Sequence, residues 1–396
     1  MTTAIKLGGS NVELVGLDET REPFITLLSD SAQLPAPLRG TRSYLVHEAP
    51  MPEGFGLYVL LDRDRSLLQS LPPDSNAVLI PDDYEYLADG DIVRVVPNRH
   101  SIRALYRKRS RHNAILVTER CNHYCLMCSQ PPRDIDDSWI VSETLEAIPL
   151  MDRETEALTI TGGEPTLLGD DLLRILRACK SWLPNTSMHI LSNGRRFADA
   201  AFAARYAAID HPDLMVGIPI YSDLSTLHDY VVQSDGAFDE TIRGILNLKR
   251  HGQQVEVRVV IHKQTYARLP QLAEFLARNL LFVDHVALMG LEITGFTRIN
   301  LDDLWIDPYD YQPQLRVAVE LLSAYRMNVS IYNHQLCVLH PSLARFARKS
   351  ISDWKNEYMP ECEGCLKRDE CGGFFSSAKL RYSDHIRPFS AAASQS

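Results

Sequence analysis

ERCNHYCLMC, residues 119–128, holds three of the chain's eight cysteines on one short loop. Cys121, Cys125 and Cys128 stand at C-x3-C-x2-C spacing, directly after an apolar run at residues 114–118. Three thiolates on such a loop can bind three irons of a [4Fe–4S] cubane, which leaves the fourth iron open to a chelating ligand. The alternative is a structural zinc site, which normally closes with four ligands. His123 would then be the fourth ligand, at an awkward position between two of the others.

The sequence beyond this loop alternates short aliphatic runs with helical patterns. Strands are predicted at residues 114–118, 157–161, 188–191, 214–220, 255–261 and 286–291, and helices at 142–150, 170–183, 197–207, 238–251 and 269–279. A further helix at 314–326 and a strand at 328–332 are predicted before the cysteine-rich tail. Strands that alternate with helices form parallel βα units with right-handed crossovers. Six units are fewer than the eight of a closed barrel, so the sequence predicts an α/β fold with a partial (β/α)6 barrel. The active site of such a fold lies at the carboxyl ends of the strands.

The cysteine loop resembles the signature of the radical S-adenosylmethionine (SAM) superfamily, which is C-x3-C-x-aromatic or apolar-C. Met127 stands where the family often has an aromatic residue, which is a mild departure. The resemblance implies a [4Fe–4S] cluster with an open iron, SAM as the cofactor that chelates it, and Cys121, Cys125 and Cys128 as the catalytic metal ligands. It also implies that an external one-electron donor reduces the cluster.

Residues at the ends of later strands fit a SAM-binding role. The turn Gly162-Gly163-Glu164-Pro165 is similar to the family motif that holds the SAM amino group, because two glycines allow close backbone approach and a glutamate accepts from an ammonium group. Ser192 and Asn193 resemble the family's ribose-contacting pair, and Gly290 its adenine-contacting strand. Arg258 lies in an apolar strand and needs a partner, for which a SAM carboxylate and a buried glutamate are equal candidates.

A second group of cysteines lies near the end of the chain. Cys337, Cys362, Cys365 and Cys371 are spaced C-x24-C-x2-C-x5-C. Four thiolates close a site, and either a structural zinc or an auxiliary [4Fe–4S] cluster satisfies that number of ligands. The last part of the pattern resembles the C-terminal extensions of peptide-modifying radical SAM enzymes, which favours the cluster. The remaining Cys179 shares a helical face with leucines and is predicted to be a core thiol.

Several stretches resemble one subfamily more closely, the His-Xaa-Ser system radical SAM maturase of the HxsC type. They cover most of residues 113–380 and comprise residues 113–133, 218–247, 285–295, 328–339 and 351–375. The resemblance implies modification of a ribosomally synthesised precursor peptide with His-Xaa-Ser repeats, together with a second radical SAM maturase as partner. Two alternatives remain: a radical SAM peptide epimerase, with Cys337 or Cys179 as hydrogen donor, and a non-catalytic subunit that binds a peptide or a maturase.

Length and composition set the wider frame. The 396 residues are 45% hydrophobic with a net charge of -10, which indicates a globular chain and argues against a nucleic-acid binder. Without an apolar leader or membrane span, the chain is expected in the cytoplasm. We predict a small β-rich domain at 1–110, the barrel at 111–310 and the auxiliary-cluster region at 311–396.

Two further features are open at this point. Seven Lys or Arg residues lie between Arg94 and Arg111, in either a solvated linker or helix, or a docking face for an acidic peptide or redox partner. The substrate peptide is predicted to lie between the strand ends and the cysteine-rich tail. Polar residues near those ends are candidates to line that cleft, namely His228, Asp229, Tyr332 and His334.

Overall fold

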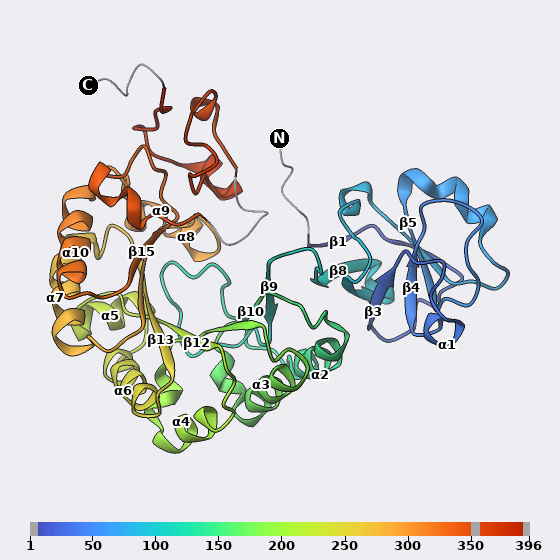
Figure 1. The fold of residues 1–396 in the computed structure, drawn as a ribbon, viewed down its shortest axis with the longest axis horizontal. Helices are drawn as coiled ribbons and strands as arrows, with labels where there is room; N and C mark the ends of the chain where they lie inside the picture. The colour runs from blue at the N-terminus through green and yellow to red at the C-terminus, as the bar shows by residue number, and fades with distance from the viewer. Residues whose placement is uncertain (1–6, 350–356, 391–396) are drawn as a thin grey trace.

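The structure is a computed structural model that describes residues 7–349 and 357–390. Figure 1 shows a β-rich N-terminal part beside a larger, curved α/β part. Each part has its own sheet, one of eight strands and one of seven. Residues 351–356, which belong to the stretch 351–375 quoted above, lie outside the described residues. In the described ranges, no helix is long and apolar enough to cross a membrane.

The larger part is a partial barrel of parallel strands, which confirms the predicted fold class. Neighbouring strands pair in chain order and in parallel throughout. The strands are β9 (His112–Leu116), β10 (Ala157–Thr161), β11 (Ser187–Leu191), β12 (Leu214–Pro219), β13 (Gln254–Ile261), β14 (His285–Gly290) and β15 (Val329–Tyr332). Because β9 and β15 lie at opposite ends of the sheet, the barrel stays open on one side.

Helices cover the convex face of this sheet (Figure 1). They are α2 (Trp139–Ala147), α3 (Asp170–Trp182), α4 (Ala200–Ala207), α6 (Ala237–Arg250), α7 (Leu269–Asn279) and α10 (Gln312–Ala324). Three further helices, α5 (Ser225–Val232), α8 (Phe296–Ile299) and α9 (Leu301–Leu304), follow strand ends and were not among the predicted elements. One face of the sheet packs against the helices that cover it, and alternate strand residues belong to that core, as do Val255, Val257 and Val259, all 0% exposed. Cys179 on α3 is also fully buried, which confirms the core thiol.

The seventh strand extends the sheet beyond the six predicted units. β15 pairs with β14 from Val286↔Val329 to Met289↔Tyr332. The sheet therefore continues past residue 310, into the range 311–396 that the sequence analysis assigns to the auxiliary-cluster region. The cysteine-rich segment begins only after β15.

The N-terminal part is a mixed sheet with strand order β1-β8-β7-β3-β4-β5-β6-β2. Its strands are β1 (Gly8–Ser10), β2 (Glu13–Val15), β3 (Phe24–Ser29), β4 (Arg42–Leu45), β5 (Leu57–Leu61), β6 (Ala77–Ile80), β7 (Ile92–Val96) and β8 (Ser101–Tyr106), and α1 (Ala36–Arg39) is its one α-helix among the described residues. The basic run from Arg94 to Arg111 lies on β7, β8 and the turn into β9. The expected linker or helix is therefore wrong: alternating buried residues such as Ile102 and Ala104 make this run a pair of strands.

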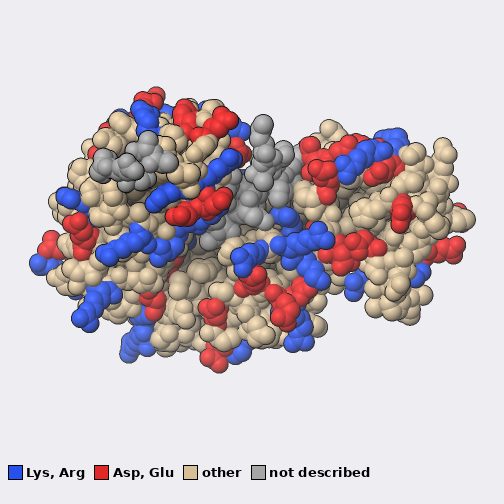
Figure 2. Space-filling model, turned by 45° about the horizontal axis from the view of Figure 1, so that its top comes forward, with Lys and Arg blue, Asp and Glu red and all other residues tan. Residues whose placement is uncertain are grey.

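The two parts share a packed junction at the first βα unit of the barrel. Ile92 and Tyr106 of the N-terminal sheet belong to the same apolar core as Val141 and Ile148. The Tyr106 hydroxyl lies 2.8 Å from Thr155 Oγ1, and both are buried. Figure 2 shows acidic and basic side chains beside one another where the parts meet. The junction is thus both apolar and charged.

The tail packs over the far end of the sheet, at the top of Figure 1. A bridge pairs Glu357 with Phe374, and Val338, Met359, Phe374 and Ile386 form a small core. The Gln335 amide donates to the Gly373 carbonyl over 2.8 Å, which ties the tail to the segment after β15. The tail therefore lies close to the carboxyl ends of β14 and β15.

Candidate active site

The three cysteines of the loop line one cavity of about 300 Å³ at the strand ends. Cys121, Cys125 and Cys128 meet there with residues in the carboxyl-terminal part of β10, β11, β12, β13 and β14 or just after these strands. This convergence follows from the parallel sheet, because the carboxyl ends of all its strands face the same edge. The structure thus brings the cysteine loop together with the predicted cofactor-binding residues Met127, Gly162, Gly163, Glu164, Ser192, Asn193, Arg258 and Gly290.

Buried polar groups fix the start of the cysteine loop. Asp137 is 0% exposed, and its Oδ2 accepts from the Thr118 hydroxyl at 2.7 Å and the Glu119 N–H at 2.6 Å. Thr118 Oγ1 in turn accepts from the Arg120 N–H at 3.1 Å. These bonds determine the direction in which the chain leaves β9 for Cys121.

Residues far along the chain fix the end of the loop. Asn300 donates to the Leu126 carbonyl at 2.9 Å, and the Thr297 hydroxyl donates to the Met127 carbonyl at 3.2 Å. The Leu126 N–H donates to the Val231 carbonyl at the end of α5, at 2.9 Å. Sequence reasoning missed Asp137, Thr297 and Asn300, because neither spacing nor residue type links them to the cysteines.

Burial sets the protonation of the loop thiols. It raises the pKa of Cys121 to about 11 and also raises the pKa of Cys125 and of Cys128. Neighbouring thiols add to the rise at Cys125, because each thiolate disfavours the next. A cationic iron–sulfur centre would offset these costs, since metal binding deprotonates the thiols that coordinate it. Three convergent, desolvated thiols therefore fit a cluster.

His123 lies beside the thiols but in a neutral, buried setting. Burial lowers its pKa to about 3, and its Nδ1 is 4.0 Å from Cys125 Sγ. It lines the same cavity as the three cysteines. Within the described residues, no three His, Cys, Asp or Glu side chains are arranged to hold a single metal ion. This holds for the cysteine loop and for the four tail cysteines alike.

The two glycines before Glu164 let the end of β10 pack against the cysteine loop. A side chain at Gly162 would place its Cβ 2.5 Å from the Thr118 carbonyl oxygen, and one at Gly163 would collide with the Arg120 carbonyl. The Gly163 N–H donates to the Thr118 carbonyl over 2.8 Å. The close backbone approach predicted for this turn is thus made by the chain's own loop. Pro165 is buried and begins a short 3-10 turn.

Glu164 is fully buried and joins the ends of β10 and β11. Its Oε1 accepts from the Thr166 N–H and hydroxyl at 2.9 and 2.6 Å, and from the Ser192 hydroxyl at 2.8 Å. Its Oε2 accepts from the Asn193 N–H at 2.6 Å. Each carboxylate oxygen has two lone pairs, and Oε2 accepts from one donor only among the described residues, so it keeps room for one further donor. Burial nonetheless raises the pKa of Glu164.

Ser192, Asn193 and Gly290 take part in the architecture as well as the lining. The Ser192 hydroxyl donates to Glu164 Oε1, while the Asn193 amide donates to Asn122 Oδ1 at 2.7 Å. Asn193 therefore ties the third strand end to the cysteine loop. A Cβ at Gly290 would lie 2.5 Å from the Asn333 carbonyl oxygen, so this glycine makes room for the segment after β15.

Arg258 has a carboxylate partner within the protein. Its Nη1 lies 2.7 Å from Glu256 Oε1, and Glu256 Oε2 lies 2.6 Å from His285 Nδ1. Burial alone would raise the pKa of Glu256, but the His285 hydrogen bond and the Arg258 charge together lower it to about 2. The buried-glutamate alternative is thus realised, while Arg258 also lines the cavity.

The expected cleft residues have structural positions instead. Asp229 accepts from the Gly236 and Phe238 N–H groups at 2.7 and 2.8 Å, at the start of α6. His228 and His334 are 1% and 2% exposed, and His334 Nε2 lies 2.7 Å from the Tyr311 hydroxyl. Neither these three residues nor Tyr332 lines the cysteine cavity. Their predicted role was wrong, because sequence position near a strand end does not tell which way a side chain turns.

A second cavity adjoins the first beneath the tail. Gly290, Leu291, Glu292 and Asn333 line both, and the second is completed by tail residues from Gly372 to Ser383. Tail and barrel meet there through Arg381, whose guanidinium lies 3.9 Å from the Trp305 ring centre. The space between strand ends and tail therefore leads to the cysteine cavity.

The four C-terminal cysteines also converge. Cys337, Cys362, Cys365 and Cys371 line one small cavity of about 20 Å³. Burial raises the pKa of Cys337 and of Cys362, and the neighbouring thiols raise both further. The donor set fits one four-thiolate centre, and whether zinc or an iron–sulfur cluster binds stays a prediction.

Part of the chain matches a known protein family. Residues 115–276, from β9 to α7, match the family model of the radical SAM superfamily. The pre-heme d1 synthase of Dinoroseobacter shibae is 30% identical over 161 residues, 39% of this chain and 38% of that protein. The chain therefore spans well under two thirds of the length of this curated relative.

Solved structures are similar at lower identity. Streptococcus suis SuiB bound to S-adenosylmethionine is 17% identical with a TM-score of 0.45, covering 57% of this chain and 51% of SuiB. Native anSMEcpe with bound AdoMet is 14% identical with a TM-score of 0.44, covering 55% of this chain and 62% of anSMEcpe. The matched family region contains the cysteine loop and the cavity-lining residues of β10 to β13, while the lining residues at β14 and Asn333 lie outside it.

Proposed function

We propose that this chain, in which residues 115–276 form a radical SAM domain, is a maturase that modifies a ribosomally synthesised peptide with His-Xaa-Ser repeats. A second radical SAM maturase is its proposed partner, and an external one-electron donor its reductant. The observation that supports an enzyme is the single cavity shared by three thiols, the Gly162–Pro165 turn and five strand ends. The subfamily resemblance quoted above supports the peptide.

The residues of the cavity have distinct proposed roles. Cys121, Cys125 and Cys128 would hold three irons of a [4Fe–4S] cluster, and together with SAM such a cluster supplies a 5'-deoxyadenosyl radical. Oε2 of Glu164 has room for the SAM amino group, and Arg258 faces the same cavity as a cation for the carboxylate. Ser192 and Asn193 would adjoin the ribose and Gly290 the adenine.

The tail is proposed to hold an auxiliary [4Fe–4S] cluster on Cys337, Cys362, Cys365 and Cys371. The convergence of these four side chains on one cavity supports a shared metal centre. The adjoining cavity between strand ends and tail is the proposed place for the peptide. Its residues Glu292, Trp305 and Arg381 take over the lining role first expected of the buried histidines.

The alternatives can be narrowed. A peptide epimerase would need a thiol beside the substrate. Cys179 does not meet this requirement, because its side chain on α3 is enclosed in the core. Cys337 lies with the other tail cysteines, which favours a ligand role over a hydrogen donor. A non-catalytic subunit would not cleave SAM at all.

Coexpression with the His-Xaa-Ser precursor peptide, with and without the partner maturase, tests the proposal. Mass spectrometry is expected to show a mass change in the peptide, and purified protein with reductant and SAM is expected to release 5'-deoxyadenosine. Cys121→Ala, Cys125→Ala or Cys128→Ala is expected to abolish both, while Cys179→Ala keeps them. Deoxyadenosine formation at the wild-type rate in any of the three variants would refute the site. An unmodified peptide with intact SAM cleavage would refute the substrate.

A further inference from the structure

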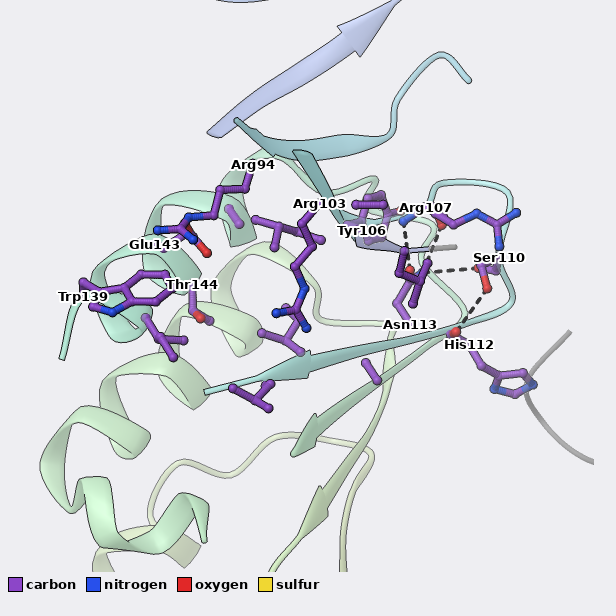
Figure 3. Close-up of a pocket in the computed structure, with 18 residues that line it drawn as sticks. Arg94, Arg103, Tyr106, Arg107, Ser110, His112, Asn113, Trp139, Glu143 and Thr144 are labelled. Carbon is purple, nitrogen blue, oxygen red and sulfur yellow. Dashed lines mark hydrogen bonds and ion pairs between the residues drawn. The ribbon is translucent and has the colours of Figure 1, made fainter. Parts of the chain in front are cut away.

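A cavity of about 150 Å³ lies at the junction between the N-terminal part and the barrel, apart from the cysteine site (Figure 3). It is lined by β8, β9 and α2, and it shares no lining residue with the cysteine cavity. The Asn113 side chain closes one end, since it accepts from the Arg107 N–H at 2.9 Å and donates to the Arg107 carbonyl at 3.1 Å. β8 and β9 belong to different sheets and do not pair with each other in the described residues. The cavity lies between these two strands.

One wall of this cavity is an unpaired strand edge. β9 is the terminal strand of its sheet, and in the described ranges no strand pairs with its outer side. The Val117 N–H donates to the Thr161 carbonyl, so Val117 faces β10. Backbone groups alternate in direction along a parallel strand, which turns the N–H and carbonyl of Ala114 and Leu116 to the free edge. Such an edge accepts an extended peptide as an added strand.

Most of the cavity lining is apolar, and its charged side chains are mainly basic. Arg94, Arg103 and Arg107 line the cavity against one carboxylate, Glu143. Arg94 is already engaged, because its Nε lies 2.6 Å from Glu143 Oε2 and its guanidinium lies 4.0 Å from the Trp139 ring centre. Figure 3 shows Arg103 reaching from β8 toward β9. Arg103 is exposed and, among described residues, makes no hydrogen bond or ion pair, which leaves its five donors for a ligand.

We propose that this junction cavity binds an acidic, extended segment of the peptide substrate, which adds to the free edge of β9 and places a carboxylate against Arg103. The segment is acidic because the arginines outnumber Glu143, although the whole chain carries a net charge of -10. The junction cavity is separate from the cysteine cavity. The bound segment therefore serves recognition, and the chemistry occurs on another part of the peptide. The identity of the occupant as substrate rests on the proposed function.

A synthetic, fluorescein-labelled peptide that alternates Glu with Val and Thr is the probe, and its Gln-for-Glu counterpart is the chemical control. The full chain is expected to bind the Glu probe in an anisotropy titration and the Gln probe at least about tenfold more weakly, since a charge-assisted pair is lost. Arg103→Glu is expected to weaken Glu-probe binding at least about tenfold. Arg109→Glu is the matched control, because Arg109 is exposed in the same basic run but does not line the cavity.

The strand edge has its own variant. Ala114→Pro removes the outward N–H without removing a bond to β10, and it is expected to weaken both probes. Equal effects of Arg103→Glu and Arg109→Glu, no binding of the Glu probe, or tighter binding of a short oligothymidylate would each overturn the proposal. Melting curves of the variants that match the wild type show that a loss of binding is not a loss of folding.

Peptide-free SAM cleavage and precursor modification separate this proposal from the proposed function. Arg103→Glu is expected to keep 5'-deoxyadenosine release and to lose modification of the coexpressed precursor. If the wild-type chain modifies no peptide but binds the Glu probe, and Arg103→Glu weakens that binding, the proposed function is refuted and the binding site is supported. Wild-type modification by the Arg103→Glu variant would refute the recognition role and leave the function in place.

Discussion

Glu164 links three parts of the site through one buried carboxylate. Four donors reach it, from Thr166, Ser192 and Asn193, so the ends of β10 and β11 are held at a fixed separation. The same turn packs against the cysteine loop through Gly162 and Gly163. A motif whose resemblance suggests a cofactor contact is therefore also a structural joint, and its substitution affects stability as well as binding.

Glu164→Gln is expected to destabilise the chain even without cofactors. In the wild type, every group that donates to Glu164 has a carboxylate oxygen as its acceptor. The amide NH₂ of glutamine is itself a donor, so it would leave a backbone N–H or a hydroxyl without an acceptor. An unsatisfied buried group costs about 1–3 kcal/mol. Urea unfolding of the apo protein measures the loss. Glu154→Gln, on an exposed turn, is the control and should leave the free energy of unfolding nearly unchanged. Equal midpoints for both variants would contradict the role of the joint.

Glu256 gives the site a pH-dependent contribution to stability. Its pKa falls from 4.5 to about 2 in the folded chain. A depressed pKa stabilises the folded state above the unfolded value, and this contribution is lost as the pH falls from about 4.5 toward about 2. The full shift corresponds to on the order of 3 kcal/mol.

Unfolding of wild type and Glu256→Gln at about pH 6 and about pH 3 tests this contribution. The wild type is expected to be the more stable protein at the higher pH, and the difference is expected to shrink at the lower pH. Glu146→Gln, exposed on α2, should show no such trend. A difference that stays constant with pH would indicate that Glu256 acts by packing alone.

At the scale of elements, the sequence predicted what depends on local pattern. The six barrel strands appear as short aliphatic runs, and the cysteine loop appears through its spacing. The predictions that failed concern the direction in which a side chain points in the folded chain. Asp229 caps α6, and His228 and His334 turn into the core, although each follows or precedes a strand end. The strand β8 within the basic run was missed because its charges hid the alternation of Ile102 and Ala104.

Asn300 between α8 and α9 is expected to hold the cysteine loop in place. Asn300→Ala removes the 2.9 Å bond to the Leu126 carbonyl and leaves that carbonyl without its donor. A lost bond of about 1 kcal/mol corresponds to several-fold faster iron release. Iron transfer to a coloured chelator, followed in anaerobic protein, measures the rate. Asn279→Ala, which removes a comparable bond at the end of α7, is the matched control and should release iron at the wild-type rate.

At the scale of the whole molecule, two added parts flank the two ends of one open sheet. The N-terminal part packs on the β9 side through Tyr106 and Ile92, and the tail packs beyond β15 through Gln335. The sequence predicted both parts by composition and cysteine content. It did not predict the cavity at the N-terminal junction, because that cavity depends on how two separate sheets diverge after Asn113.

The tail is expected to bind its metal independently of the cysteine loop. A variant with Cys121, Cys125 and Cys128 all changed to Ala should keep about four irons per chain, as one cubane on four cysteines would give. Elemental analysis of anaerobically purified protein measures iron and zinc together. The reverse variant, with Cys362 and Cys365 changed to Ala, should keep the iron of the loop. Zinc in place of iron in the first variant would favour the structural-zinc alternative.

The ties between the cysteine loop and α8 also set an order of events during synthesis. Thr297 and Asn300 bond to Met127 and Leu126 across separations of 170 and 174 residues. At about 5–20 residues per second, a ribosome needs about 10–35 seconds to make that intervening chain. Throughout that interval the Leu126 and Met127 carbonyls lack these two donors, although residues up to Val231 can already hold the rest of the loop. The end of the cysteine loop therefore reaches its final anchoring only after residue 300 has emerged from the ribosomal tunnel.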